Sequence, residues 1–358
     1  MKILVAGDRG YIGAVLVPFL RAAGHQVDGL DSGLYEGCDL GGGPGAVEKA
    51  ARDTRAVHPR ELEGYDAVVC LAALSNDPLG QLNPASTFSI NLHGTVHLAR
   101  AAKKAAVPRF VFASSCSLYG AAGSTAVAED APMRPVTPYG ETKALAEEQL
   151  SSLADDEFSP TYLRNATAYG ASPRLRLDIV LNNLTGTAVT TGRVKLESDG
   201  TPWRPLVHVE DISRTCAAVL EAPRELVHDE SFNVGRSEDN VRIADIAELV
   251  AHGVPGSSVE LARDAGPDRR SYQVDFAKLS DTFAGLQLAW TVPAGVDELV
   301  GAYREHGLTL EEFQSSRFTR LRRINELLAA GFLDELLYRQ TDTDFATLPR
   351  SEPTAVPA

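Results

Sequence analysis

The sequence predicts an α/β protein built on a doubly wound parallel sheet, with a smaller lobe formed by the C-terminal half of the chain. Two observations lead to this prediction. In residues 1–165, short apolar runs alternate with longer segments of helical periodicity, which is the order that βαβ units require. After about residue 165 the elements shorten and loops rich in Gly, Pro and Arg interrupt them, as is typical of a lobe that builds a pocket from loops.

The expected elements of the first half follow one another in strand and helix order. Strands are predicted at residues 2–7, 25–31, 67–73, 109–114 and 161–164. Helices are predicted at residues 11–23, 83–106 and 138–153. The last helix has a clear start, because Thr137 is a suitable N-cap residue and Pro138 occupies the first helical position.

Length and charge limit the classes of function. The chain has 358 residues, of which 44% are hydrophobic and 23% charged, as in an ordinary globular protein. At roughly 100–200 residues per domain, it forms two domains or one α/β domain with a lobe. The 34 basic and 48 acidic residues give a net charge of −14, which argues against nucleic acid and anionic membranes as partners. Any phosphate that the protein binds must therefore be held by local groups.

Targeting signals and disulfides are not expected. The first apolar run is too short for a signal peptide, and no stretch approaches the 18 apolar residues of a membrane span. The four cysteines lie far apart and form no CxxC pair, which fits reduced thiols: Cys38, Cys70, Cys116 and Cys216. We therefore expect a cytoplasmic protein.

A glycine motif stands between the first strand and the first helix. It reads Gly7-Asp8-Arg9-Gly10-Tyr11-Ile12-Gly13, and such glycines allow a tight turn and a close approach of a pyrophosphate to the helix N-terminus. Asp31 ends the second strand, 18 residues after Gly13. A carboxylate there can accept hydrogen bonds from a ribose and would repel a 2′-phosphate, so the pattern favours NAD over NADP.

A second motif combines Tyr139 and Lys143 at the start of the helix at residues 138–153. Spaced i, i+4, the two side chains lie on one helical face. A phenol ionises near pH 10, so it needs a nearby cation to serve as a base at neutral pH. An ammonium one turn away and the helix N-terminus both favour the phenolate. By its spacing alone, however, the pair is more often an exposed Tyr and Lys.

A third segment favours a functional role for the Tyr139 and Lys143 pair over an exposed pair. Phe112-Ala113-Ser114-Ser115-Cys116-Ser117-Leu118-Tyr119-Gly120 follows a strand, and Ser115 precedes Tyr139 by 24 residues. With the two motifs above, it resembles the extended short-chain dehydrogenase/reductase family, in its NAD-dependent nucleotide-sugar epimerase/dehydratase branch. The resemblance covers about residues 1–300 and extends through Asn91-Leu92-His93-Gly94-Thr95, Asn182-Asn183-Leu184, the segment from Trp203 to Asp211, Phe232-Asn233-Val234-Gly235 and Asp268-Arg269-Arg270-Ser271-Tyr272.

The resemblance implies a Rossmann-type fold that binds NAD, and a role for each matching residue. Tyr139 would be the general base, Ser115 would hydrogen-bond the reacting sugar hydroxyl, and Lys143 would lower the pKa of Tyr139 and hold the nicotinamide ribose. Cofactor contacts would be Gly7, Gly10, Tyr11, Ile12, Gly13, Asp31, Asp53, Leu71, Ala72, Ala73, Asn91, Ser114, Tyr139 and Lys143. Substrate contacts would be Ser117, Asn183, Arg204 and Arg270, or its neighbour Arg269. No metal is implied.

The resemblance also implies a division of the chain. Residues 1–165, completed by parts of 206–236, would bind NAD, and residues 166–306 would form most of the substrate-binding lobe. Residues 307–340 form a helical extension beyond the family core, for which an interface role is the simplest interpretation. Residues 341–358 are polar and contain proline, which predicts a flexible tail. A homodimer through the helices at 83–106 and 138–153 is expected by analogy.

Departures from the family pattern narrow the reaction. Dehydratases of this branch carry Asp-Glu after the catalytic Thr, whereas this sequence has Cys116 and Ser117, which argues against 4,6-dehydration. Cys116 stands three residues before Tyr119, whereas the acid cysteine of 3,5-epimerases stands two before, so we expect it only to line the pocket. Thr167 replaces a usual Asn on the phosphate side.

Other residues of chemical interest have simpler interpretations. His93 and His97 have metal-ligand spacing but no third ligand, and a surface or interface position is expected. His208 is expected to be structural, and Cys70 and Cys216 to be core thiols.

The predicted reaction is epimerisation of a nucleotide sugar, most simply at C4. It would proceed through a transient 4-keto sugar, with hydride return from bound NADH. A nucleotide-sugar ketoreductase would use the same Ser115, Tyr139 and Lys143. Another dehydrogenase or dehydratase of the family, an enzyme that oxidises or decarboxylates a uronic acid, and a dinucleotide-binding protein without turnover stay open as alternatives.

Overall fold

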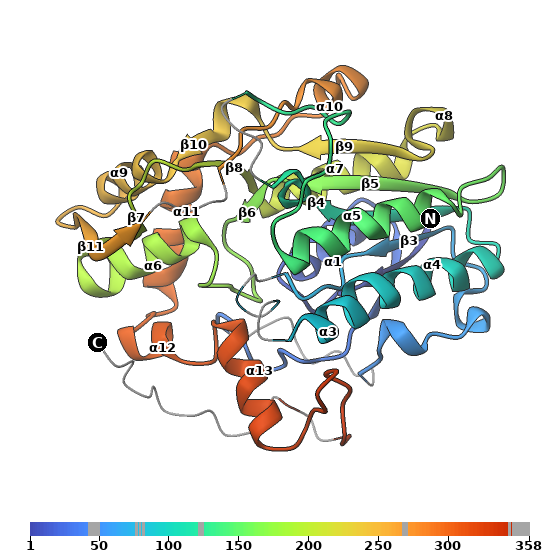
Figure 1. Ribbon diagram of the computed structural model, residues 1–358, viewed down its shortest axis with the longest axis horizontal. Coiled ribbons are helices and arrows are strands. Elements are labelled where there is room, and N and C mark those ends of the chain that lie inside the picture. The colour runs from blue at the N-terminus through green and yellow to red at the C-terminus, as the bar shows by residue number, and fades with distance from the viewer. Residues whose placement is uncertain are drawn as a thin grey trace.

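The computed structural model describes residues 1–41, 51–75, 78, 80, 83–120, 125–266, 271–342 and 345. Its centre is a six-stranded sheet in the order β2-β1-β3-β4-β5-β9, with every neighbouring pair parallel (Figure 1). The strands are β1 (Lys2–Ala6), β2 (Gln26–Leu30), β3 (Ala67–Cys70), β4 (Arg109–Ser115), β5 (Ser159–Asn165) and β9 (Glu230–Val234). The predicted doubly wound parallel sheet is confirmed.

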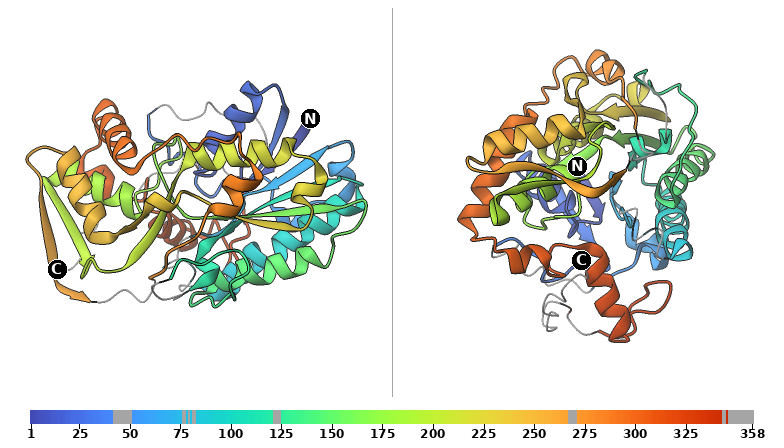
Figure 2. Two further views of the ribbon diagram at one scale, coloured as in Figure 1. Left: turned by 90° about the horizontal axis from the view of Figure 1, so that it is seen from above. Right: turned by 60° about the vertical axis from the view of Figure 1, so that its left-hand side comes forward.

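Apolar residues on both faces of the strands explain why helices cover both sides. Ile3 and Val5 of β1 pack with Leu16 of α1 (Gly13–Ala22), on the side where α7 (Val209–Glu221) also lies. Leu4 packs instead with the layer of α4 (Thr95–Lys104) and α5 (Pro138–Ser151), so the sheet lies between two helical layers (Figure 2). The strand order reverses between β1 and β3, which places a crevice at their carboxyl ends.

The long helix predicted at 83–106 is confirmed as a continuous helical segment from Pro84 to Lys104, but it is not α-helical throughout. The chain forms α3 (Pro84–Thr87), the π-helical segment η3 (Phe88–Gly94) and then α4. The wider turn contains Asn91, whose amide bonds to the Leu74 backbone, and Gly94, where a Cβ would lie 2.9 Å from Thr54 Oγ1. Single π-turns of this kind are frequent beside functional sites.

The smaller lobe has two short sheets and a helical core of its own. Strand β8 (Trp203–His208) pairs with β6 (Thr167–Tyr169) and β10 (Asn240–Arg242), and β7 (Arg193–Ser198) pairs with β11 (Ser258–Gly266). Helices α6 (Val180–Thr191), α9 (Ile243–Gly253) and α11 (Val292–Glu305) pack through buried apolar side chains. Further short elements occur in both parts of the chain: η1 (Thr54–Ala56), η2 (Pro59–Leu62), η4 (Cys116–Tyr119), α8 (Arg224–Val227), η5 (Ser237–Asp239) and α10 (Ala277–Thr282).

The C-terminal extension is less helical than predicted. It forms α12 (Leu310–Gln314) and α13 (Arg320–Ala329), and residues 330–342 follow as turns. The extension folds back and lies beside the carboxyl ends of the strands of the main sheet (Figures 1 and 2). Within the described part of the chain, no helix combines the length and the hydrophobicity that crossing a membrane requires.

Candidate active site

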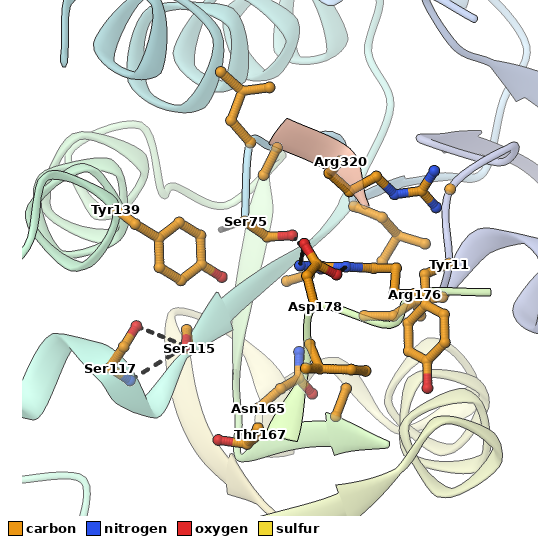
Figure 3. A pocket seen from close by; sticks show the side chains of 18 of the residues that line it. Tyr11, Ser75, Ser115, Ser117, Tyr139, Asn165, Thr167, Arg176, Asp178 and Arg320 are labelled. Carbon is orange, nitrogen blue, oxygen red and sulfur yellow. Dashed lines mark hydrogen bonds and ion pairs between the residues drawn. The ribbon is translucent and has the colours of Figure 1, made fainter. Parts of the chain in front are cut away.

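A cleft of about 970 Å³ gathers most of the predicted site residues at the carboxyl ends of the strands (Figure 3). The predicted residues in its wall are Gly7, Gly10, Tyr11, Ile12, Gly13, Asp31, Asp53, Leu71, Ala72, Ala73, Ser114, Ser115, Ser117, Tyr139, Lys143, Asn183 and Arg204. Arg269 and Arg270 lie outside the described residues. Residues more than 190 positions apart in the chain thus form one site.

The glycine motif forms a tight turn directly before α1. Gly7 has φ +89°, and its N–H donates to the Leu30 carbonyl at 2.7 Å. A Cβ on Gly13 would lie 2.1 Å from the Gly7 carbonyl oxygen, so only glycine fits there. Gly10 lines the cleft at the N-terminus of α1, and a Cβ there would lie 3.1 Å from the Gly7 carbonyl oxygen, so glycine keeps this turn compact where a pyrophosphate would approach.

The carboxylates of Asp31 and Asp53 line the cleft together with the glycine turn. Asp31 accepts hydrogen bonds from the backbone N–H groups of Gly33 at 2.7 Å and Arg9 at 3.3 Å, which hold it at the end of β2. Asp53 forms an ion pair with Arg55 at 2.5 Å. The glycine turn and the Asp31 carboxylate fit the pyrophosphate and a ribose of NAD, and the carboxylate would repel a 2′-phosphate.

Tyr139 and Lys143 are positioned by the first turn of α5. Thr137 caps the helix as predicted, its Oγ1 accepting from the Gly140 N–H at 3.2 Å. The Lys143 Nζ lies 5.7 Å from the centroid of the Tyr139 ring and donates to the Ala113 carbonyl at 2.6 Å. Burial lowers the pKa of Lys143 to about 8, because desolvation disfavours its ammonium. The structure therefore places a buried cation beside the phenol.

Ser115 lies at the end of β4, on the same side of the cleft as Tyr139 (Figure 3). Its Oγ accepts from the Ser117 N–H at 3.2 Å, and the two hydroxyl oxygens are 2.8 Å apart. A serine hydroxyl both donates and accepts, so the Ser115 and Ser117 pair can hydrogen-bond a sugar hydroxyl in either protonation state.

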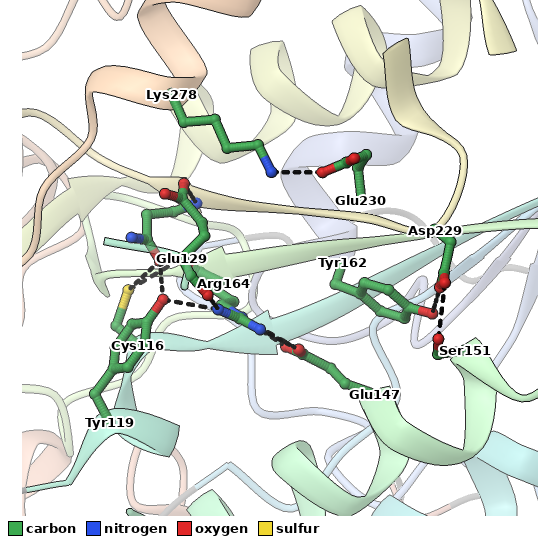
Figure 4. Close-up of polar contacts among 11 residues, drawn as sticks. Cys116, Tyr119, Glu129, Glu147, Ser151, Tyr162, Arg164, Asp229, Glu230 and Lys278 are labelled. Atoms are coloured by element: carbon green, nitrogen blue, oxygen red, sulfur yellow. Dashed lines mark hydrogen bonds and ion pairs between the residues drawn. The ribbon is translucent and has the colours of Figure 1, made fainter. Parts of the chain in front are cut away.

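The expectation that Cys116 lines the pocket is wrong. Its side chain is 0% exposed, is not part of the cleft wall, and places Sγ 3.0 Å from the Arg164 carbonyl oxygen, within the buried network drawn in Figure 4. Burial raises the pKa of this thiol well above its usual value, so it is a neutral core group. The side-chain direction, which spacing alone does not determine, follows from the turn at η4.

A buried polar network supports the loop that carries Ser115 and Ser117. Arg164 forms an ion pair with Glu147 at 2.7 Å and donates to the Tyr119 hydroxyl at 2.9 Å (Figure 4). The Tyr119 hydroxyl donates in turn to Asn233 Oδ1 at 2.7 Å. The residues that carried the family resemblance around Tyr119 and Asn233 thus join β4, β5 and β9 beneath the site.

Asn91, predicted to contact the cofactor, is bonded to the backbone of Leu74 in this structure. It is 0% exposed and does not reach the wall of the cleft. Its Oδ1 accepts from the Leu74 N–H at 2.8 Å and its Nδ2 donates to the Leu74 carbonyl at 3.0 Å. It therefore fixes the chain that leaves β3 along the cleft.

The opposite side of the cleft contains charged residues that sequence reasoning missed. Arg176 forms an ion pair with Asp178 at 2.9 Å and donates to Ser75 Oγ at 2.7 Å (Figure 3). Arg320, from the C-terminal extension, and Thr167 also line the cleft. The run Arg174-Leu175-Arg176-Leu177-Asp178, with charges in a proline-containing loop, was the available signal for the first pair.

Arg204 and Asn183 lie on this side too, and both have backbone partners. Arg204 donates to the Trp203 carbonyl at 2.9 Å, and Asn183 donates to the Leu177 carbonyl at 2.8 Å.

His208, His97, Cys70 and Cys216 have structural surroundings. His208 contacts Glu298 at 2.8 Å and stacks on Trp290 at 3.9 Å, which confirms a structural role. His97 contacts the Val57 carbonyl at 2.9 Å. Among the described residues, no group of His, Cys, Asp and Glu is suited to hold a metal ion. Cys70 and Cys216 are buried core thiols, as predicted.

Comparison with known proteins agrees with this geometry. The chain is 30% identical over 320 residues to a UDP-glucose 4-epimerase of Lactobacillus helveticus, covering 81% of this chain and 92% of that protein. It is 28% identical over 318 residues to a dTDP-glucose 4,6-dehydratase of Streptomyces griseus, covering 85% and 94%. The solved structure of MoeE5 in complex with UDP-glucose and NAD matches with a TM-score of 0.70 at 26% identity, covering 85% of this chain and 99% of that one.

A family model identifies the branch. The model described as the NAD dependent epimerase/dehydratase family matches residues 3–235, which include the glycine turn, Ser115, Tyr139, Lys143 and nearly all of the main sheet. The chain therefore belongs to the NAD-dependent epimerase/dehydratase family.

Proposed function

We propose that this protein is a nucleotide-sugar 4-epimerase. The observation that carries the proposal is that each carboxylate lining the described part of the cleft already has a partner. Asp31 bonds to backbone N–H groups, and the ion pairs are Asp53 with Arg55, Asp178 with Arg176, and Glu197 with Lys195. Dehydration needs an acid and a base beyond the catalytic tyrosine, and Cys116 and Ser117 supply no carboxylate beside Ser115.

The chain's own residues are arranged to move one proton. Tyr139, as a phenolate, would take the proton of a sugar hydroxyl, while Ser115 hydrogen-bonds the same oxygen. The Lys143 Nζ lies 5.7 Å from the centroid of the Tyr139 ring, and an ammonium beside the ring attracts a phenolate, so Lys143 favours that state of Tyr139. NAD, when bound, supplies the acceptor and the donor for hydride, so the 4-keto sugar is formed and then reduced without net oxidation.

The return step uses the same groups in reverse. Tyr139, now protonated, gives its proton to the carbonyl oxygen of the 4-keto sugar. For the product to be the epimer, the sugar must turn and present its other face. The cleft lies near the upper end of the size range of small-molecule sites, so it can contain a dinucleotide end and a sugar together.

The substrate's diphosphate would be held by the smaller lobe. Arg204 and Arg176 line the cleft there, and planar guanidinium groups suit phosphate oxygens. UDP-glucose and dTDP-glucose in the names of the relatives, and UDP-glucose bound to MoeE5, support a nucleoside diphosphate sugar as the substrate class.

The test is an NMR assay of the purified protein in deuterated water, with a panel of nucleotide sugars and no added cofactor. The proposal expects a new epimer without incorporated deuterium, because hydride would return internally to one carbinol carbon. Deuterium beside a carbonyl would contradict it and indicate enolisation, as in dehydration or 5-epimerisation. Turnover that begins only when NADH or NADPH is added would replace the epimerase with a ketoreductase.

Two further alternatives to the epimerase predict different measured results. Release of carbon dioxide from a UDP-uronic acid would indicate an oxidative decarboxylase, and NAD binding without turnover on any sugar would indicate a binding protein. The homodimer through α4 and α5 and the cytoplasmic location stay predictions.

A further inference from the structure

The C-terminal extension lies beyond the family match, which ends at residue 235, yet it reaches the cleft. Thr319, Arg320 and Leu321 from the start of α13, and Leu337 from the turns after it, are part of the wall. MoeE5 covers 85% of this chain, so part of the chain has no counterpart in that structure. The extension therefore contributes residues from beyond the family match to the wall of the cleft.

The extension is attached to the loops that follow β2 and β3. Leu34 and Leu74, one from each loop, share an apolar cluster with Ile324, Leu327 and Leu337. These contacts bury the inner face of α13 against the rims of the cleft.

Polar contacts hold the turns after α13 in the same place. Arg55, which pairs with Asp53 of the cleft, lies 3.5 Å from the centroid of the Tyr338 ring and donates to the Leu336 carbonyl at 2.7 Å. Arg339 donates to the Ser32 carbonyl at 3.1 Å, one residue from Asp31. The extension is thus joined to both segments that carry the carboxylates on the glycine side of the cleft.

Leu337 keeps its position in an unfavourable backbone conformation. It has φ +61°, in the left-handed region, which is unfavourable by roughly 1–2 kcal/mol for a residue with a Cβ. Such a conformation persists only where surrounding contacts determine it, and it is frequent in ligand clamps. Its side chain is buried and lines the cleft.

Arg320 is the most informative residue of the extension. It is 4% exposed, lies 4.0 Å above the Tyr35 ring and donates from Nη2 to the Arg174 carbonyl at 3.2 Å, while Nη1 has no partner. No carboxylate forms an ion pair with it among the described residues, because Asp178, the nearby acidic group, is paired with Arg176. A buried guanidinium without an anion is costly, and a phosphate oxygen is its natural complement.

We propose that the C-terminal extension forms part of the NAD site, with Arg320 contacting the diphosphate of the cofactor and Leu337 covering its adenosine half. The position argues for the cofactor rather than the sugar nucleotide, because the extension contacts the segments of Asp31, Tyr35 and Asp53, whereas Arg204 and Asn183 lie on the smaller lobe. The proposal deepens the proposed function, since an epimerase must retain NAD between turnovers.

The test measures binding of NAD and of UDP separately by calorimetry on the full chain freed of cofactor, without any turnover. Arg320→Ala is expected to weaken NAD binding about 10- to 100-fold, and Leu337→Ala about 10-fold, with UDP affinity unchanged. Arg322→Ala, on the same helix but outside the cleft, and Leu336→Ala, which removes an exposed neighbour, are the matched controls and should bind NAD normally.

The two binding measurements distinguish contact with the diphosphate of NAD from contact with the diphosphate of the sugar nucleotide. Weakened UDP binding with normal NAD binding would overturn the proposal and place the extension on the substrate side, and no change in either would overturn it too. A second measurement needs no variant: NAD should slow amide hydrogen exchange in residues 319–342, and unchanged exchange would contradict the proposal. Because no sugar is converted, failure of the epimerase function leaves both readouts intact.

Discussion

The two sides of the cleft are built in different ways. The sheet side, defined here as the glycine turn with Ser115, Tyr139 and Lys143, consists of backbone turns and polar side chains at strand and helix ends. The arginine side, defined as Arg176, Arg204 and Arg320, consists of buried cations on loops, on β8 and on the C-terminal extension. The sheet side is suited to proton transfer and dinucleotide binding, and the arginine side to the charge of a diphosphate.

This difference teaches where a strongly acidic protein can bind anions. The net charge of −14 does not attract phosphates, but three buried guanidinium groups, one of them paired with Asp178, line one cleft and can bind an anion locally. This division predicts that substitutions on the sheet side change the rate, the stability or NAD binding, and that substitutions on the arginine side change the affinity for a diphosphate without changing the rate at saturation.

The largest effect is expected on the sheet side, for Tyr139→Phe. Removing the hydroxyl that moves the proton should lower turnover about 10²- to 10⁴-fold, because that is the usual contribution of a general base. NAD affinity should change little, since the ring stays in place. Steady-state rates and NAD calorimetry check this, with Tyr65→Phe as a control far from the cleft. Undiminished turnover would remove Tyr139 from the mechanism.

The next effect concerns the pH dependence of stability. The pKa of Lys143 is about 8 in the folded protein, below its ordinary value near 10.5, because burial disfavours the ammonium. The unfolded chain therefore binds more protons between these pH values, so the free energy of unfolding should rise by about 1.4 kcal/mol per pH unit from pH 8 upward. This contribution is lost as the pH falls through 8.

Urea unfolding of the cofactor-free protein at pH 7 to 10 measures that slope. The difference from Lys143→Met should reach about 3 kcal/mol over the full interval, whereas the exposed Lys104→Met should keep the slope of the unaltered protein. Parallel curves for the protein and Lys143→Met would mean that Lys143 titrates as an ordinary exposed lysine.

Gly13→Ala should lower both stability and NAD affinity. The new methyl group would lie 2.1 Å from the Gly7 carbonyl oxygen, so the turn must move, at a cost of about 1–3 kcal/mol. Gly301→Ala is the control, because no atom lies within 4 Å of its added Cβ and alanine favours a helix. Thermal melting and NAD calorimetry report the two effects. Normal NAD binding by Gly13→Ala would separate the turn from the cofactor site.

The smallest effect is expected on the arginine side, for Arg204→Ala. UDP affinity should fall about 10-fold, the loss of one charged hydrogen bond, while NAD affinity and the rate at saturating substrate stay unchanged. Arg193→Ala, which removes a solvent-exposed arginine, is the control, and a melting curve checks folding. A fall in rate without a change in UDP affinity would break the division between the two sides.

The sequence by itself determined the parallel sheet, the glycine turn, the capped helix start at Thr137 and the Tyr139 and Lys143 pair. These features depend on neighbours within a few positions, through alternation of apolar runs, helix capping and i, i+4 spacing. Local pattern is therefore enough to identify their residues, and the fold brings the glycine turn, Tyr139 and Lys143 into one cleft.

The tertiary structure alone decided which way side chains point and which distant segments meet. It turned Cys116 into the core, bonded Asn91 to the Leu74 backbone in a π-helical turn, and brought Arg176 and Arg320 to one cleft across 144 positions of chain. These outcomes depend on packing between strands, lobe and extension. Local pattern contains no information about such long-range contacts, because periodicity specifies the face of an element and not its partner.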